Sequence, residues 1–404
     1  MLLGWSFGVG DEISAWFTAM TIRNVFFSLI QSGRISSAFV PEHIRISEEH
    51  SKQASTEFAS ALMTWFLVLS IAACIVSSLA ITPMINLFFF SLSNETIVLS
   101  KSLAAMLIWI IVFDSALAIM MAVLRAENCF KTPEIAQLTS SVVLITVVYF
   151  GHEYCGVWIL LIAAYAQALV SLTITIQKCY FLSILPKIQF RSSFLRKDWL
   201  IKTLSAISFY TFSTQLVSLF LASALTKLPD AFYPSFNYMK SAINKVVGSI
   251  ISPLMSVGIT KTAKEKNNAQ LGKFIKQNNR LVAFLIISLF TGYIFSANLA
   301  IRFLWNVKDP LILEVMWDCG FVLLVTSTTG LAFTSFRMRA YSLNHAGALY
   351  FFWSLWQLTA ALFLYLFPSD GSLTEIAMIL FTLNFAVGAT SVAISKWPRT
   401  GLVN

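Results

Sequence analysis

The feature that most limits what this chain can fold into is a series of long apolar runs separated by short polar connectors. Most runs are long enough to cross roughly 30 Å of hydrocarbon as a helix. Strands of a membrane barrel would be about ten residues long and would alternate strictly between apolar and polar residues. The runs therefore predict an all-α polytopic membrane protein of about eleven transmembrane helices. The predicted spans are 12–33, 56–82, 96–123, 134–150, 156–177, 199–224, 232–258, 281–301, 311–336, 343–367 and 373–395.

The composition agrees with this prediction. Of the 404 residues, 57% are hydrophobic and 12% are charged, whereas soluble proteins carry roughly 25% charged residues. A soluble fold of this length has too little interior to bury so much apolar surface. The excess must face lipid.

The basic residues divide unevenly between the two sides that alternating spans define. Of the 28 lysines and arginines, 21 lie in connectors on one side, 3 on the other and 4 inside spans. Cytoplasmic connectors are rich in lysine and arginine, so we predict a cytoplasmic C-terminus and an outside N-terminus. The net charge of +9 follows from these connectors. It does not form the basic, aromatic-rich face that a nucleic-acid partner requires.

No pattern in the sequence indicates catalysis or a cofactor. The five cysteines share no CxxC spacing, and the four histidines form no HExxH pattern, so we expect neither a metal site nor a disulfide. A P-loop, a GxSxG motif and a DxD motif are also absent from the sequence. We therefore expect a protein that is not an enzyme and that needs no cofactor.

The connectors also suggest how the chain is organised. A long basic connector separates five predicted spans from the six that follow. We therefore predict an N-terminal bundle at 1–180, a cytoplasmic amphipathic linker at 181–198 and a C-terminal bundle at 199–404. Transporters are often built from two such repeats around a central cleft. Two bundles of six would be symmetric, so we expect that one helix before the first visible span is missing.

Three segments resemble a known family. They are FGVGDEISAWFTAMTIRNVFFSLIQSGRISSAFVP from Phe7 to Pro41, LRAENCFKTP from Leu124, and VVGSIISPLMSVGITK from Val246 to Lys261. In this order they resemble the MviN/MurJ family of lipid II flippases, part of the multidrug/oligosaccharidyl-lipid/polysaccharide exporter superfamily. The matching positions are Gly8, Gly10, Ala15, Phe17, Ala19, Asn24, Gly33, Ser37, Ala38, Phe39, Val40, Pro41, Leu124, Asn128, Phe130, Pro133, Val246, Gly248 and Lys261.

The resemblance implies a flippase of the bacterial cytoplasmic (inner) membrane. Such a protein moves a saccharide linked to undecaprenyl pyrophosphate, similar to the peptidoglycan precursor lipid II, by alternating access. The implied partners are this lipid-linked saccharide, membrane lipids and proteins of cell-envelope biosynthesis. In the family a helix precedes the first segment, which agrees with twelve helices minus the first. The resemblance implies structural roles for Gly10, Asn24, Gly33, Ala38, Phe39, Pro41 and Gly248.

The sequence departs from the family pattern at charged positions. The family's acidic residues fall on Ser14 and Ser32, and its paired arginines fall on Phe27 and Ser28. In the second half, another family arginine falls near Tyr238. These groups line the family's cationic cavity. Their loss favours a second substrate class, a lipid-linked O-antigen or exopolysaccharide repeat unit.

Charged residues inside predicted spans are the candidate functional groups, because a charge in lipid is costly and usually faces a cavity. Arg23, Lys240 and Lys245 are candidate cleft cations for a pyrophosphate headgroup, which arginine can bind bidentately. Asp114 is a candidate ion-coupling carboxylate or a partner for one of these cations. Lys101, Glu314 and Asp318 are further candidates of this kind.

Two further function classes remain open at this stage. A cation-coupled drug antiporter of the same superfamily would need membrane carboxylates, and Asp114 is the one well placed. An inactive remnant or scaffold would follow from the expected missing helix. Independently of function, tryptophans at the ends of spans predict anchors in the membrane interface. These are Trp199, Trp305 and Trp397.

Overall fold

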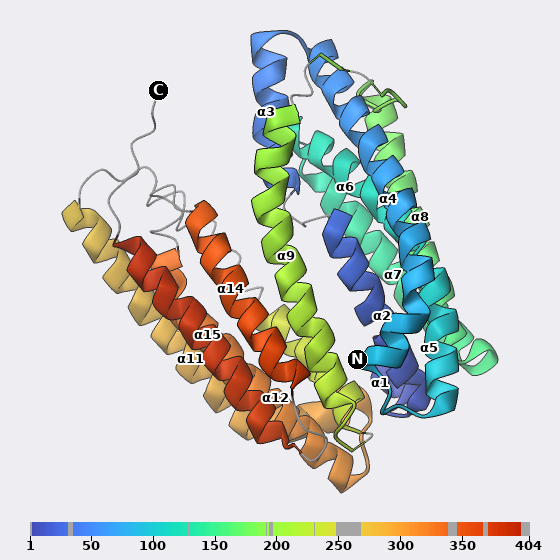
Figure 1. Ribbon diagram of the computed structural model, residues 1–404, viewed down its shortest axis with the longest axis vertical. Coiled ribbons are helices and arrows are strands. Elements are labelled where there is room, and N and C mark those ends of the chain that lie inside the picture. The colour runs from blue at the N-terminus through green and yellow to red at the C-terminus, as the bar shows by residue number, and fades with distance from the viewer. Residues whose placement is uncertain are drawn as a thin grey trace. The chain divides into compact units, whose positions relative to one another are not determined.

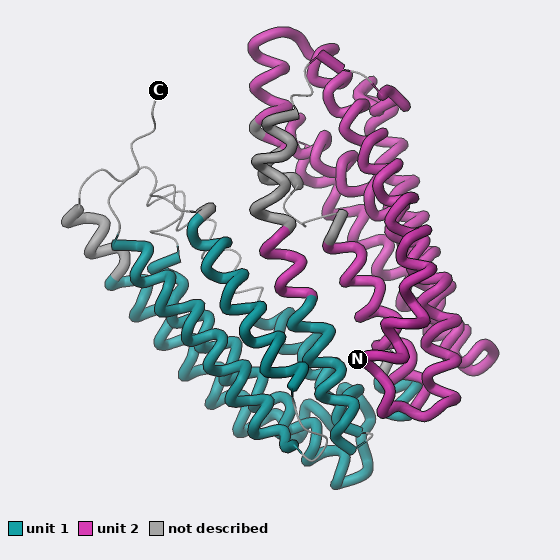
Figure 2. Tube along the Cα trace, viewed as in Figure 1, with its two compact units in different colours: residues 1, 3–10, 216–404 teal, residues 2, 11–215 magenta. Residues whose placement is uncertain are grey.

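The computed structural model describes most of the chain, and every regular element in the described part is a helix. The chain forms two compact units. The unit here called the N-terminal unit comprises Leu2 and Asp11–Gln215, and the C-terminal unit comprises Met1, Leu3–Gly10 and Leu216–Asn404 (Figure 2). The described residues are 2–30, 35–127, 129–190, 192–193, 197–229, 231–247, 268–337, 346–366 and 371–396.

The N-terminal unit is a bundle in which α4 and α6 form the centre of the packing (Figure 1). Both α2 and α3 pack against α4 and α6, α7 packs against α8, and α5 contacts α2 and α4. The helices are α2 (Asp11–Ile30), α3 (Ile35–Glu49), α4 (Lys52–Phe88), α5 (Asn94–Leu107), α6 (Ile110–Ala126), α7 (Lys131–Cys155), α8 (Trp158–Phe181) and the first part of α9 (Lys197–Leu225).

The short helix α3 contributes one face to the core of this unit. Phe39, His43 and Ile46 are buried at a spacing of four and three residues, which places them on one side of a helix. The Phe39 ring stacks on Phe58 of α4 at 5.5 Å. The charged residues Arg45 and Glu49 are exposed on the other side. This helix is therefore amphipathic and packs along the ends of α4 and α6.

The predicted span 96–123 is two helices, α5 and α6, which join at residues 108–109. A break in a membrane helix frees backbone carbonyls that lipid cannot satisfy. Here the Tyr165 hydroxyl donates to the Met106 carbonyl at 2.7 Å, and the Cys74 thiol donates to the Ile108 carbonyl at 3.2 Å. Donors from α8 and α4 thus stabilise the break. The predicted span is confirmed, since residues 94–126 together are long and apolar enough to cross a membrane. An apolar run does not predict the turn within it, because the donors that stabilise the turn come from other helices.

The segment that follows α8 is extended and is held against α4. The backbone N–H of Lys187 donates to Ser60 at 3.0 Å, and that of Gln189 donates to Thr64 at 2.8 Å. Trp65 also donates its indole N–H to the Phe190 carbonyl at 3.3 Å. Two residues of extended chain span about 6.6 Å and four residues of helix about 6 Å. The spacing from Lys187 to Gln189 therefore matches the spacing from Ser60 to Thr64, and the segment packs along α4 with each N–H group opposite a hydroxyl.

The C-terminal unit is a second helical bundle, in which α12 packs against α11 and α15, and α15 packs against α14 (Figure 1). Two glycines permit close helix contact. A Cβ at Gly388 would overlap the Phe333 ring, and one at Gly320 would overlap the Tyr293 hydroxyl. Its helices are α1 (Leu2–Phe7), the end of α9, a helix at 232–247, α11 (Asn268–Trp305), α12 (Pro310–Ala332), α14 (Ala346–Tyr365) and α15 (Leu373–Ser395).

Eight helices among the described residues are long and apolar enough to cross a membrane. They correspond to eight of the eleven predicted spans and confirm an all-α polytopic membrane protein. The span predicted at 199–224 contains a shorter apolar helix, Phe209–Leu225. The span at 12–33 contains α2, and the span at 232–258 extends beyond the described residues. The two-bundle division at 181–198 stays a prediction.

Candidate functional site

The candidate site in the N-terminal unit is an ion pair between helices that lie far apart in the sequence. Arg23 of α2 donates one terminal N–H group to the carboxylate of Asp114 on α6. Its other terminal nitrogen donates to the side-chain oxygen of Asn24 at 3.1 Å. The guanidinium also lies over the Phe27 ring, 5.1 Å from its centroid. The side chains of Arg23 and Asp114 are 12% and 24% exposed, so both charges are largely removed from solvent.

The chemistry of this pair follows from the geometry of guanidinium. Arginine has five N–H donors and no acceptor, and the contacts with Asp114 and Asn24 use one N–H group on each terminal nitrogen of Arg23. The pair with Asp114 compensates the charge, while Asn24 and Phe27 fix the plane of the group. The site therefore offers an oriented guanidinium with donor capacity left over, which suits an oxyanion ligand.

The two candidate lysines belong to the C-terminal unit and lie on the helix at 232–247. Lys240 is half-buried and Lys245 is exposed. Five residues correspond to about 140° around a helix, so the two ammonium groups point in different directions from their helix. Their role as cleft cations stays a prediction, as does that of Arg23.

The residues of the family motif lie in different environments in the structure. Phe39 is fully buried in the core beside α4, and Asn24 accepts from Arg23. Gly10 connects α1 and α2 at a place where a Cβ would meet open space. Ala38 and Pro41 lie within α3. Two further motif residues, Gly33 and Gly248, fall outside the described residues.

The described positions where the family carries charge hold uncharged side chains here, and Ser32 lies outside the described residues. Ser14 is buried, and the buried Ser28 hydroxyl donates to the Val25 carbonyl at 2.6 Å. Tyr238 is also buried, and its hydroxyl donates to the Gly8 carbonyl at 2.8 Å. None of these described groups supplies a positive charge.

One expectation from the sequence is wrong. Trp305 was expected to anchor the end of its span in the membrane interface, but it is only 6% exposed. Its indole lies directly against α1, where a Cβ at Gly4 would overlap the ring. An anchor needs an indole at the lipid surface, and this indole is enclosed by protein. Trp397 and the side chain of Trp199 lie outside the described part of the structure.

Several solved structures of membrane transporters share this fold. The chain is similar to an inward closed conformation of lipid II flippase MurJ, with a TM-score of 0.72 and 19% identity, over 98% of this chain and 82% of that one. It is also similar to an inward-facing multidrug resistance MATE family transporter of the MOP superfamily (0.71, 16%, covering 98% and 92%). A MOP superfamily transporter from Pyrococcus furiosus Vc1 (DSM3638) gives 0.69 at 16% identity, over 98% and 90%. The fold is that of a polytopic membrane transporter.

Sequence comparison then identifies the family. The family model described as lipid II flippase MurJ matches residues 5–307. The lipid II flippase MurJ of Thermosipho africanus (strain TCF52B) is 29% identical over 148 residues, which are 37% of this chain and 30% of that protein. The match thus spans about a third of the relative's length. The chain belongs to the MurJ family, a family of transporters.

Proposed function

We propose that this chain is a flippase that moves a saccharide linked to undecaprenyl pyrophosphate, similar to lipid II, from the cytoplasmic to the outer leaflet. The observation that carries the proposal is the family match over residues 5–307. The transport would proceed by alternating access, with the lipid tail remaining in the membrane. We place the protein in the bacterial cytoplasmic membrane with its C-terminus inside, because basic residues gather on one set of connectors.

In this proposal Arg23 contacts the pyrophosphate of the substrate. The guanidinium is already oriented by Asn24 and Phe27, so the side chain of Arg23 loses little conformational entropy when a phosphate oxygen binds. Asp114 holds the arginine in the absence of substrate and compensates its charge. An oxyanion of the headgroup would then bind the guanidinium beside this carboxylate or in its place. The positive charge of Arg23 would therefore always be compensated by a negative group within the membrane.

Lys240 and Lys245 have different parts in the proposal. The half-buried Lys240 is placed to hold an anion where water is limited. The exposed Lys245 attracts the headgroup through a longer-range field, which salt screens over roughly 8–10 Å. We therefore expect transport by Lys240→Gln to fall at all salt concentrations, and transport by Lys245→Gln to fall mainly at low salt.

A second substrate, a lipid-linked O-antigen or exopolysaccharide repeat unit, is favoured by one observation. Phe27, Ser28 and Tyr238 stand at or near family arginine positions, and none of these three side chains carries a positive charge. A headgroup that needs fewer cations would fit such a site. The pyrophosphate contact at Arg23 would be the same for both substrates.

Complementation separates these two substrates. The chain is expressed in a strain depleted of its own lipid II flippase, and growth is scored with Arg23→Gln as the matched loss-of-function variant. Rescue by the native chain but not by the variant supports the lipid II reading. Failure to rescue would favour the second substrate if the chain also restores surface polysaccharide in a strain that lacks its exporter of O-antigen or exopolysaccharide repeat units. Failure of the membrane-inserted chain in both strains would overturn the proposed function.

A further inference from the structure

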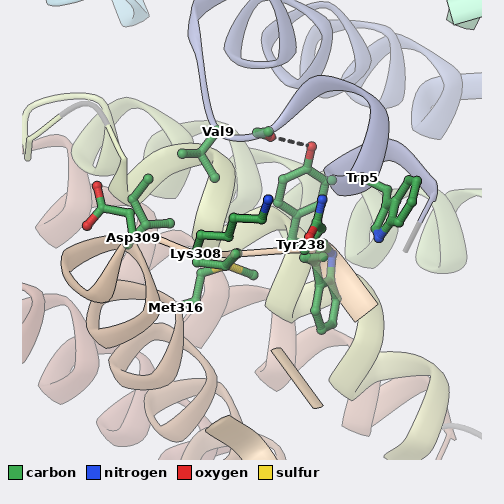
Figure 3. Close-up of a pocket in the computed structure, with 12 residues that line it drawn as sticks. Trp5, Val9, Tyr238, Lys308, Asp309 and Met316 are labelled. Atoms are coloured by element: carbon green, nitrogen blue, oxygen red, sulfur yellow. Dashed lines mark hydrogen bonds between the residues drawn. The ribbon is translucent and has the colours of Figure 1, made fainter. Parts of the chain in front are cut away.

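The C-terminal unit contains a cavity that the transport argument above does not use (Figure 3). It has a volume of about 240 Å³ and lies where α1 and the turn after it meet the end of α11, the start of α12 and the helix at 232–247. Its lining combines aromatic rings with one cation and one carboxylate. The residues used below are Trp5, Tyr238, Trp305, Lys308 and Asp309.

Specific interactions shape the wall of this cavity. The Tyr238 hydroxyl donates to the Gly8 carbonyl at 2.8 Å, as the dashed line in Figure 3 shows. Gly8 has a φ of +62°, in the left-handed region that glycine adopts without strain. Asn306 has a φ of +53° although it carries a side chain. The walls are thus fixed by a hydrogen bond and by the left-handed backbone of Asn306, a conformation that is often kept at functional sites when the residue is not glycine.

One residue of the cavity wall, Trp305, carries a buried hydrogen-bond donor. Trp305 is 6% exposed, and its indole N–H is buried without a hydrogen-bond partner. Buried polar groups are nearly always paired, so this donor favours a ligand that offers an acceptor. Gly4 packs so closely on this indole that a Cβ would overlap it. The ring is therefore held in place, and its N–H group is a hydrogen-bond donor of fixed position.

The other groups define the chemistry of that ligand. Lys308 offers an ammonium, whereas the Asp309 carboxylate accepts from the backbone N–H of Leu311 at 2.9 Å and retains further acceptor capacity. The two charges sum to zero, which does not suit a phosphate. Trp5 and Tyr238 add aromatic surface. The cavity is smaller than the roughly 300–1,000 Å³ pockets that hold drug-sized ligands, so it suits a single ring.

We infer that this cavity binds one sugar ring of a saccharide. A sugar ring has an apolar face of C–H groups for the aromatic side chains, and its hydroxyls both donate and accept. The Trp305 N–H and the Lys308 ammonium would donate to the hydroxyls, and the Asp309 carboxylate would accept from one. That the saccharide is part of the transported substrate rests on the proposed function. The connector at 306–309 lies on the predicted outer side, where that saccharide would leave.

Binding can be measured on the purified full chain in detergent, without any transport. Binding of the neutral saccharides N-acetylglucosamine and glucose is measured by saturation-transfer difference NMR. Binding of inorganic phosphate, the anionic probe, is measured by ³¹P relaxation. Trp305→Phe keeps the ring and removes the N–H group, and Lys308→Gln removes an exposed charge without disturbing the packing. Each should weaken saccharide binding about three- to tenfold, the effect of one net hydrogen bond.

Two variants are the matched controls. Trp317→Phe changes a tryptophan of α12 outside the cavity, and Arg302→Gln changes an exposed cation of α11 outside it; both should bind the saccharide as the native chain does. Saccharide signals that are absent, or equal in all variants, overturn the inference. Phosphate binding that is lost in Lys308→Gln also overturns it, in favour of an anion site.

The result can be distinguished from a failure of the proposed function. A chain that binds the saccharide through Trp305 but complements neither strain would overturn the transport proposal and leave the binding site standing. A chain that complements but shows no saccharide binding at this cavity would overturn the inference alone.

Discussion

At the scale of single residues, the molecule keeps an arginine inside a predicted membrane helix because a carboxylate from another helix lies against it. Removing one partner of such a pair leaves an uncompensated charge, which costs about 3–5 kcal/mol. Because Asp114 retains 24% exposure, we expect Asp114→Asn to lower the free energy of unfolding by about 3 kcal/mol, at the low end of that range. Equilibrium unfolding in mixed detergent micelles measures the change.

The same measurement includes a control and a rescue. Arg125 and Glu134 form a pair at 3.7 Å whose side chains are 38% and 65% exposed, so Glu134→Gln should cost at most about 1 kcal/mol. The exchange of Arg23→Asp with Asp114→Arg should recover part of the stability lost in either single variant. Equal costs for Asp114→Asn and Glu134→Gln would contradict a buried, compensated pair in the N-terminal unit.

His43 gives a prediction about pH. It is buried on α3, its Nε2 is 3.8 Å from the Glu127 carboxylate, and Lys52 contacts the same carboxylate at 3.0 Å. Burial lowers the pKa of His43 below its ordinary value of 6.5, although Glu127 opposes the shift. The unfolded chain then binds the proton more readily than the folded one. Stability is therefore full above about pH 6.5 and is lost as the pH falls below it, toward the lowered pKa of the folded state.

Melting temperature in detergent between pH 7.5 and pH 5 tests this sign. The native chain should lose stability on acidification, and His43→Gln should lose less. His50 is exposed on the same connector, so His50→Gln is the matched control and should keep the native pH response. A native-like pH response in His43→Gln would show that other groups cause it.

At the scale of elements, the extended segment after α8 depends on two hydroxyls of α4. Ser60 and Thr64 are buried, and each accepts a backbone N–H from Lys187 or Gln189. Removing a hydroxyl leaves a backbone donor without a partner, at a cost of about 1–3 kcal/mol each. We expect Ser60→Ala with Thr64→Val to release the segment, so that limited proteolysis cuts within 184–198 faster.

The control for this prediction is Thr173→Val on α8. Its hydroxyl is exposed and bonds only to its own helix, at the Leu169 carbonyl. This substitution should leave the rate of cleavage unchanged. A segment that is cut equally fast in the native chain and in the double variant would show that these hydrogen bonds do not hold it.

The elements also show what a sequence can and cannot predict. Long apolar runs predicted the membrane helices because length and composition alone decide whether a helix can lie in lipid. The break between α5 and α6 was not predicted, since Tyr165 and Cys74 stabilise it from other helices. Asp114 was predicted as a possible partner for one of the candidate cations, but the sequence did not identify Arg23 as that cation, since the two residues are 91 positions apart. Such pairings depend on packing, which local patterns do not encode.

At the scale of the whole molecule, the predicted orientation in the membrane can be tested with the native cysteines. Cys155 is exposed at the end of α7, whereas Cys74, Cys179 and Cys319 are buried. Alternation of the predicted spans places the connector after α7 outside. Lys396 lies after α15 and is exposed, and the excess of basic residues places it inside. The two positions should therefore react from opposite sides of the membrane.

We expect a membrane-impermeant maleimide to label Cys155 in intact spheroplasts. In a chain carrying Cys155→Ser and Lys396→Cys, labelling should require permeabilised membranes, because position 396 would face the cytoplasm. The chain with Cys155→Ser alone measures the background from Cys129, which is half-buried. Labelling of Cys155 only after permeabilisation, with labelling of position 396 in intact cells, would invert the topology. The cavity at Trp305 would then lie on the side where the substrate is made, and its ligand would be a saccharide being taken up for transport.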